Sequence, residues 1–240
     1  MKKKKKENYV ELSVGDGTTM HAYVARPTMR GEQFPALMLF QEAFGVNPHI
    51  RNLAERFAAE GYVVIAPELF HRTAPLGFEE SYTDFAAITP HIQGLTQDSL
   101  EADINATWNW LQQDGKVHHD CIGSTGYCMG GRVSFLANTM LPLKAAISYY
   151  GSRIVPDLIK KADHLHGPMM FFWGGLDKHI PQEQIAAVMD GMNAAGKPYI
   201  NTVISYADHG FFCDARASYN EQAAKEAWSL TLAFLKNKLV

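Results

Sequence analysis

Cysteine and membrane-length hydrophobic runs are both scarce in this chain. The 240 residues contain three cysteines, Cys121, Cys128 and Cys213, an odd and sparse count that argues against the disulfide framework of a small secreted domain. No stretch reaches the roughly 18–20 consecutive apolar residues of a membrane helix. A chain of this length buries roughly 70–75% of its unfolded surface, so it needs no disulfide or structural metal for stability.

An excess of charge of one sign is also lacking. Lys+Arg number 22 against 25 for Asp+Glu, and the net charge is −3 at pH 7. Because no long basic face is present, nucleic acid is not an expected partner. The one basic run, Lys2–Lys6, is followed by polar residues rather than the apolar core of a signal peptide. We expect a disordered basic N-terminus over residues 1–7 and a soluble, cytoplasmic protein with no membrane partner.

Motifs for nucleotides and metals are absent as well. Neither the Gly-x-Gly-x-x-Gly fingerprint nor the Gly-Lys-Ser/Thr end of a phosphate-binding loop occurs. The histidine pairs His118-His119 and His164-x-His166 lack the Cys/His spacing typical of a zinc site. We therefore expect no cofactor and no metal.

Secondary-structure signals alternate along the chain. Tyr9–Val14 and Thr19–Ala25, joined by the turn Gly15-Asp16-Gly17, predict a β-hairpin. Short apolar runs typical of buried parallel strands then alternate with amphipathic segments. The predicted later strands are 36–40, 62–66, 120–125, 144–149, 168–173 and 199–205, and the predicted helices are 48 to the stop at Gly61, 98–113, 130–139, 182–195 and 219–236.

This alternation after an antiparallel start predicts the fold class. We expect an α/β protein with a doubly wound, mostly parallel sheet and helices on both faces. No internal repeat and no linker divides the chain, so a single domain over residues 8–240 is expected. The segment 68–97 contains two prolines and has weak periodicity, which predicts a long functional loop in place of a separate cap domain.

One Gly-rich turn, Gly126-Tyr127-Cys128-Met129-Gly130-Gly131, carries a potential nucleophile. It has the Gly-x-nucleophile-x-Gly layout of a nucleophile elbow, with cysteine in the usual place of serine. The nucleophile of an elbow has a strained backbone, and larger residues two positions away would collide with the neighbouring strand and helix. The start of the following helix favours a thiolate and a developing oxyanion. Taken alone, the motif also fits an ordinary buried cysteine.

Two further residues strengthen the hydrolase interpretation. An elbow requires an acid and then a histidine later in the chain, each just after a strand. Asp177 follows strand 168–173 and His209 follows strand 199–205, so both the positions and the order are met. His209 is expected to take the thiol proton, and Asp177 to orient the imidazole. Asp208 is a rival for the orienting role, but a sequence neighbour rarely points its side chain at the adjacent ring.

Together these motifs resemble the dienelactone hydrolase family, the carboxymethylenebutenolidase-like α/β hydrolases, over essentially the whole chain. A cysteine elbow combined with the Gln-Glu-x-x-Gly segment that begins at Gln41 is specific to this group. The resemblance implies an α/β-hydrolase fold and cleavage of a small, anionic ester or lactone through a thioester acyl-enzyme. The similar segments are residues 41–50, 61–70, 126–131, 173–177 and 208–211.

The resemblance also implies roles for individual residues. Cys128, Asp177 and His209 would be the triad, and Glu42 would hydrogen-bond the resting thiol and take its proton when substrate binds. The backbone N–H groups of Met129 and Ala43 would hold the oxyanion, each worth roughly 3–4 kcal/mol.

Arginines of this family bind a carboxylate on the substrate, and Arg72 lies at a matching place in the long segment. A second arginine is expected four residues after the catalytic histidine, where this chain has Cys213, and Arg216 is the next candidate. Phe44 is a candidate for the substrate pocket, and so are Phe70, Phe211 and Phe212. The expected partner is a small-molecule substrate, and the expected state is a monomer or small homo-oligomer.

Two alternatives remain open from the sequence. One keeps the fold and makes the protein a broad-specificity esterase or thioesterase. The other is a non-hydrolytic module in which Cys128 is a redox-sensing or ligand-binding thiol. A sensor has no need of an acid and a histidine in hydrolase order, which favours hydrolysis.

Overall fold

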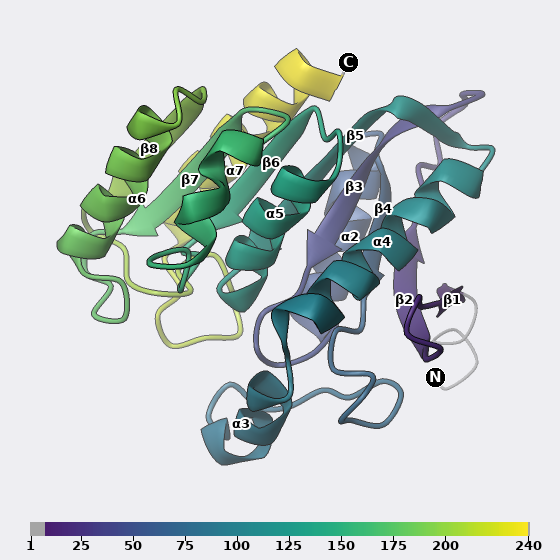
Figure 1. Cartoon of the computed structure of the whole chain (residues 1–240), viewed down its shortest axis with the longest axis horizontal. Helices are drawn as coiled ribbons and strands as arrows, with labels where there is room; N and C mark the ends of the chain where they lie inside the picture. The colour runs from purple at the N-terminus through teal and green to yellow at the C-terminus, as the bar shows by residue number, and fades with distance from the viewer. Residues whose placement is uncertain (1–7, 240) are drawn as a thin grey trace. The chain divides into compact units, whose positions relative to one another are not determined.

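The structure, a computed structural model, describes residues 8–239 (Figure 1). The predicted disordered N-terminus, residues 1–7, lies outside the described residues. The chain divides into two compact units, Met1–Ile122 and Gly123–Val240. Whether residues 8–240 form a single domain stays a prediction.

The first unit contains the predicted N-terminal hairpin. Strand β1 pairs antiparallel with β2, β2 pairs antiparallel with β4, and β3 pairs parallel with β4. The order of these strands is β1-β2-β4-β3. Both β3 and β4 are almost continuously apolar and buried, as expected of strands that are covered on both faces. Their bounds are β1 Tyr9–Ser13, β2 Thr19–Ala25, β3 Phe34–Phe40 and β4 Val63–Pro67.

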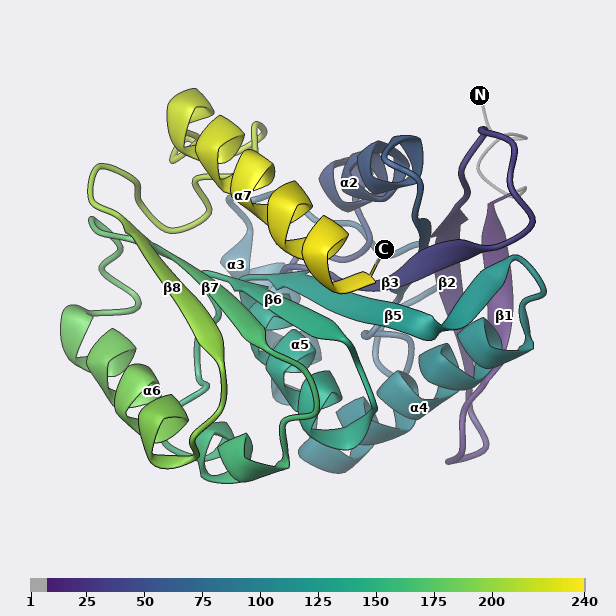
Figure 2. The same cartoon turned by 90° about the horizontal axis from the view of Figure 1, so that it is seen from above.

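Helices of the first unit cover both faces of these strands, with α2 on one side and α4 on the other (Figure 2). Helix α2 begins after Asn47, whose side chain accepts the Ile50 N–H at 3.2 Å, and Pro48 occupies its first turn. The chain leaves it through Gly61 at φ 98°. The helices are α2 Pro48–Ala59, α3 Phe85–Gln93 and α4 Gln97–Gln113.

Helix α3 corrects the prediction of a continuous loop over residues 68–97. Asp84 starts this nine-residue helix by accepting the Ala87 N–H at 3.0 Å. Pro90 lies inside it and Ile88 is its one buried residue, so neither the helix period nor a sharp boundary is visible in the sequence. Between β4 and α4, the described chain forms no other helix, which agrees with the absence of a separate cap domain.

The second unit is built on parallel strands. Strand β5 continues into it from the first unit, and the order is β5-β6-β7-β8 with every neighbouring pair parallel. β5 is longer than predicted because its first half carries exposed polar residues that hide the strand signal. β6 and β7 are fully buried. The bounds are β5 Val117–Tyr127, β6 Ala145–Tyr149, β7 Met169–Gly174 and β8 Tyr199–Ile204.

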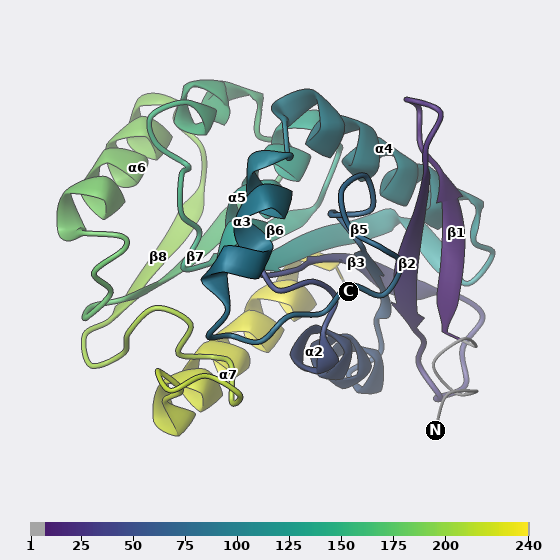
Figure 3. The same cartoon turned by 90° about the horizontal axis from the view of Figure 1, so that it is seen from below.

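Helices again lie on both faces of these strands, which confirms the predicted doubly wound arrangement. Figures 2 and 3 show α5 and α6 on one face of β6–β8 and α7 on the other. A 3-10 helix, η1, was not predicted, because a single short turn leaves little periodicity to detect. The bounds are α5 Met129–Met140, η1 Leu158–His164, α6 Gln182–Ala194 and α7 Glu221–Leu239.

A buried amide joins α5 to the entry of β7. The Asn138 side chain is fully buried, and its Nδ2 donates to the Gly167 carbonyl at 2.8 Å. Its Oδ1 accepts the Gly167 N–H at 2.9 Å. Since both ends of the amide are satisfied, a polar side chain is tolerated in this part of the core.

The Asn138→Ala substitution removes the two hydrogen bonds to Gly167 and a third to the Met169 sulfur at 3.2 Å, and it leaves both backbone groups of buried Gly167 unpaired. We expect the free energy of unfolding to fall by about 2–4 kcal/mol, measured by urea denaturation. Asn193→Ala, at an exposed amide of α6, is the control and should change stability by less than about 0.5 kcal/mol. Equal stability of Asn138→Ala and the unaltered protein would show that the amide does not anchor this segment.

Candidate active site

Cys128 lies at the turn between β5 and α5, with φ 53° and ψ −117°. A non-glycine residue in this region costs of order 1–3 kcal/mol, so the surroundings must hold it there. Its N–H donates to the Tyr149 carbonyl at 3.0 Å, and its own carbonyl accepts the Gly131 N–H at 3.0 Å. The nucleophile candidate is therefore fixed by the neighbouring strand on one side and by its own helix on the other.

Two glycines of the predicted elbow are required by close backbone approaches. A Cβ at Gly126 would lie 1.9 Å from the Gly130 carbonyl oxygen. A Cβ at Gly131 would lie 2.7 Å from the Gly151 Cα atom. Neither contact can relax by moving a flexible side chain, because both involve backbone atoms. The strand-to-helix turn can close this tightly only with glycine at both positions.

Three of the predicted residues meet at this turn. The His209 Nε2 atom lies 3.2 Å from the Cys128 Sγ atom, and its Nδ1 lies 2.7 Å from the Asp177 Oδ2. The other Asp177 oxygen accepts the N–H groups of His179 at 2.7 Å and Ile180 at 3.2 Å. Asp177 and His209 are each 7% exposed. The arrangement is a continuous chain of thiol, imidazole and carboxylate.

The Asp208 carboxylate takes a different partner. It accepts the backbone N–H of His209 at 2.6 Å. The imidazole ring thus contacts Asp177, which is 32 residues away in sequence, and not its direct neighbour.

Electrostatics favour the charged forms of His209 and Asp177. Burial works to lower the pKa of His209, but the negative charge of the Cys128 thiolate and the hydrogen bond to Asp177 outweigh it and raise that pKa to about 10. Burial likewise works to raise the pKa of Asp177, and its bonds to His209 and to two backbone N–H groups outweigh it and lower the pKa. The site therefore stabilises an imidazolium beside the Asp177 carboxylate.

The comparison with known proteins identifies the family. A model of the family described as "Dienelactone hydrolase family" matches residues 20–239. This chain belongs to the dienelactone hydrolase family. It is a carboxylic ester hydrolase that acts on lactones or esters.

Individual relatives of this dienelactone hydrolase family member cover nearly its whole length. It is 36% identical to a Synechocystis protein named "Putative carboxymethylenebutenolidase", over 90% of this chain and 91% of that one. An Escherichia coli protein of the same name is 34% identical, over 92% of this chain and 83% of that one. A crystal structure described as a "Putative Dienelactone Hydrolase" from Klebsiella pneumoniae has a TM-score of 0.85 and 33% identity, covering 95% of this chain and 98% of that one. The α/β-hydrolase fold is thereby confirmed.

An aromatic cluster, which sequence reasoning missed, supports the family's elbow in this chain. The Tyr149 ring stacks between Tyr127 and Phe172, at 4.5 Å from each centroid. The Tyr150 ring lies 5.0 Å from the His209 ring and has a φ of 37°. Two adjacent tyrosines at the end of a predicted strand were the available signal. Phe211 and Phe212, which sequence reasoning offered as pocket residues, are buried.

Glu42, Ala43 and Phe44, to which the family resemblance assigns roles, follow β3 in the first unit. Glu42 is fully buried, and the Gln41 side chain bridges its carbonyl at 3.2 Å to the Leu69 N–H at 3.1 Å. Phe44 packs with Ala43 in a hydrophobic cluster that includes Ile88 of α3. The loop is thus held by both polar and apolar contacts. The roles of Glu42, Ala43 and Phe44 stay predictions.

Arg72 is bound by carboxylates of the chain itself. Its two terminal nitrogens donate to the Asp103 carboxylate at 3.0 and 2.8 Å, and its Nε donates to Asp16 at 2.7 Å. Asp103 is fully buried and also lies 3.1 Å from the His71 Nε2. A substrate carboxylate would have to displace one of these acids from the guanidinium.

Arg216 and Cys213 lie shortly after His209. The guanidinium carbon of Arg216 is so close to Gly210 that a Cβ there would be 2.6 Å away, and Gly210 has a φ of 76°. Cys213 is fully buried, and Cys121 is partly buried. Arg216 is therefore next to the residue that follows the histidine, while its function stays a prediction.

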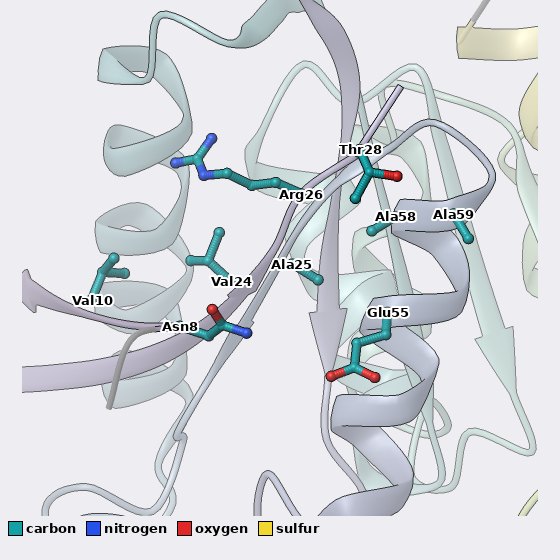
Figure 4. Close-up of a pocket in the computed structure, with 9 residues that line it drawn as sticks. All are labelled: Asn8, Val10, Val24, Ala25, Arg26, Thr28, Glu55, Ala58 and Ala59. Carbon is teal, nitrogen blue, oxygen red and sulfur yellow. The ribbon is translucent and has the colours of Figure 1, made fainter. Parts of the chain in front are cut away.

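A cavity of about 440 Å³ lies in the first unit (Figure 4). Its polar groups have partners: the Asn8 amide donates to the Tyr23 hydroxyl at 3.1 Å, that hydroxyl donates to Glu55 at 2.7 Å, and Arg26 pairs with Asp114. None of the predicted site residues lines it. The lining residues are Asn8, Val10, Val24, Ala25, Arg26, Thr28, Glu55, Ala58 and Ala59.

Among residues 8–239, no helix is both long and apolar enough to cross a membrane.

Removing the thiolate should lower the pKa of His209. In Cys128→Ala, burial still disfavours the imidazolium while the largest favourable charge is gone. The imidazolium should therefore lose its proton at a lower pH than in the unaltered protein, as followed by NMR titration of the ring protons. Cys121→Ala is the matched control and should leave the titration unchanged. An equal or higher His209 pKa in Cys128→Ala would contradict the charge pairing.

Asp103→Ala should destabilise the protein because it leaves Arg72 without its bidentate partner and His71 without its acceptor. We expect a loss of about 3–5 kcal/mol in the free energy of unfolding by urea denaturation. Asp16→Ala removes the exposed partner of the same guanidinium and should cost no more than about 1 kcal/mol. If the two variants were equally stable, the buried pair of Arg72 and Asp103 would contribute nothing to the free energy of unfolding.

Proposed function

We propose that this hydrolase cleaves a small, anionic lactone or ester through Cys128, His209 and Asp177, with a thioester acyl-enzyme. The two contacts of the His209 ring support this most directly. Its Nε2 lies 3.2 Å from the Cys128 Sγ, and its Nδ1 lies 2.7 Å from the Asp177 carboxylate. These are the separations that nucleophile, base and orienting acid need for proton transfer.

In the acylation step, the Cys128 thiolate attacks the carbonyl carbon of the substrate, and the carbonyl electron pair moves onto oxygen. The N–H groups of Met129 and Ala43 are the proposed donors to that oxyanion. Met129 is the first residue of α5, where backbone N–H groups lack partners within the helix. The positive end of the helix also favours the negative charge.

Collapse of the tetrahedral intermediate breaks the bond between the carbonyl carbon and the ring or ester oxygen. The leaving oxygen takes the proton from Nε2 of the His209 imidazolium. A thioester on Cys128 remains, and in a lactone the released hydroxyl stays attached to the acyl group. Asp177 keeps its charge throughout and holds the ring by Nδ1.

Deacylation uses one water molecule. His209 accepts a water proton on Nε2 while the oxygen attacks the thioester carbonyl, and collapse of this second intermediate breaks the carbon–sulfur bond. The thiolate then lies again beside an imidazolium, which is the charge state that raises the pKa of His209. The net reaction adds one water to the ester bond and gives a carboxylic acid and an alcohol.

Two considerations support the remaining parts of the proposal. Glu42, buried directly after β3, takes the role that the family resemblance gives it: it hydrogen-bonds the resting thiol and takes its proton when substrate binds, and this proton passes to His209 before the imidazolium gives it to the leaving oxygen. The relatives are named "Putative carboxymethylenebutenolidase", and that name denotes an enzyme for a butenolide lactone with a carboxymethylene group. A small lactone with a carboxylate is therefore the substrate class we propose.

Kinetics on a panel of small lactones and activated esters will test the proposal. Cys128→Ala and His209→Ala should each lower kcat/KM by at least about a thousandfold, since the triad acts as a unit. Cys121→Ala is the matched cysteine control and should retain full activity. Intact-mass and peptide analysis after rapid quenching of a slow ester should find the acyl group on Cys128.

Full activity of Cys128→Ala, or no turnover of any ester by the unaltered protein, would contradict the proposed function. Faster turnover of neutral esters or thioesters than of lactones would instead identify the broad-specificity esterase or thioesterase.

A further inference from the structure

Two arginines of the second unit, Arg132 and Arg153, carry the inference. Arg132 is the fourth residue of α5 and lies about one helical turn beyond Cys128, which directly precedes the helix. Side chains of a helix lean toward its N-terminus, which brings the Arg132 guanidinium back toward the thiol.

Arg153 lies on the loop that follows β6, and its charge acts on Arg132. Gly151 of this loop contacts the first turn of α5: a Cβ at Gly131 would lie 2.7 Å from its Cα, and a Cβ on Gly151 itself would lie 3.2 Å from the backbone nitrogen of Arg132. Arg153 comes two residues later, with a φ of 60° that a non-glycine residue rarely adopts. The loop is thus held against the helix turn that bears Arg132.

Neither guanidinium has a counterion. Within residues 8–239, neither makes a hydrogen bond or an ion pair, and the buried Nε of Arg132 has no acceptor. Asp157 of the same loop pairs with Lys160, and Asp177 pairs with His209. These two acids therefore already have basic partners.

Neighbouring charges shift the pKa of Arg132. Burial lowers the pKa of Arg132, the positive charge of Arg153 lowers it further, and the Cys128 thiolate opposes both. Arg132 is half-buried and Arg153 is exposed, so the cost of leaving the pair without an anion falls mainly on Arg132. An anion that binds between them removes this cost, and a guanidinium offers a planar fork of donors that matches a carboxylate.

We propose that Arg132 and Arg153 form the subsite that binds the carboxylate of the substrate, beside Cys128. The inference rests on the proposed function for the identity of the substrate, while the anion site itself does not. The sequence suggests Arg72 as the residue that binds the substrate carboxylate, but Arg72 is already bonded to Asp103 and Asp16. Arg132 and Arg153, which pair with no acid among residues 8–239, can instead bind an anionic substrate.

Alkylation of Cys128 by two reagents of nearly equal size tests the subsite without any hydrolysis. Iodoacetate carries a carboxylate and iodoacetamide is neutral, and both transfer a CH₂ carbon to the thiolate with loss of iodide. The second-order rates are measured with peptide mapping to Cys128, and the iodoacetate rate is divided by the iodoacetamide rate. This ratio cancels any change in the fraction of thiolate, which affects both reagents equally.

We expect the ratio to fall about tenfold in Arg132→Met and in Arg153→Met, the size of one lost charge-assisted hydrogen bond, and further in the double variant. Arg132→Lys should fall between, because it keeps the charge without the fork. Arg30→Met removes an exposed arginine of the first unit as the matched control and should leave the ratio unchanged. If Arg132→Met does not fold, Arg153→Met and Arg132→Lys decide the matter. An unchanged ratio in these variants, with a normal iodoacetamide rate, would overturn the subsite.

Hydrolysis of a matched pair of esters separates this inference from the proposed function. One ester carries a carboxylate on its acyl chain, and the other carries a methyl group there. The preference in kcat/KM for the anionic ester should fall in the same variants, mainly through KM. Normal turnover with an unchanged preference would reject the subsite and leave the hydrolase intact. No turnover of either ester by the unaltered protein would reject the proposed function, while the alkylation ratio would still report on the anion site.

Discussion

The backbone contact between Gly126 and Gly130 is the constraint on which the rest of the site depends. Because Gly126 has no Cβ, its backbone can lie close enough to the Gly130 carbonyl for one residue to join β5 to α5. That residue, Cys128, has a positive φ. The strain at Cys128 is offset by the hydrogen bond from its N–H to Tyr149 and by the new helix turn. The result is a thiol that stands free of its own strand, within reach of His209.

Charge and burial reinforce each other at this site. A single buried charge would be neutralised, but here the Asp177 carboxylate, the His209 imidazole and the Cys128 sulfur follow one another at hydrogen-bond distances. Burial disfavours charge on both His209 and Asp177, but negative neighbours raise the pKa of His209 and the bond to His209 lowers the pKa of Asp177. Desolvation would favour the neutral form of Asp177 or His209 if either were alone. Here it instead strengthens the interaction between their charges. The two backbone N–H donors to Asp177 complete this compensation.

The sequence alone predicted the parts of the candidate site whose positions follow from strand ends and glycines. Cys128, Asp177 and His209 each follow a strand of the parallel part of the sheet, and parallel strands bring such residues to one edge, so their meeting could be expected. Helix α3 could not be predicted, because Pro90 and a mostly exposed surface erase the helical period. Nor could the pairing of Arg72, since its partner Asp103 lies 31 residues away and no local pattern announces such a contact.

Tyr149 connects the nucleophile to a distant part of the chain. Its carbonyl accepts the Cys128 N–H, while its buried hydroxyl lies 2.6 Å from the hydroxyl of Thr231 on α7, 82 residues later. The two positions should therefore vary together in evolution. A relative without a hydroxyl at position 231 would leave the phenol its bond to the Ala227 carbonyl at 3.2 Å but one partner fewer, so phenylalanine would then cost less at position 149. Residue 231, far from the elbow in sequence, thus belongs to the same unit of selection as Cys128.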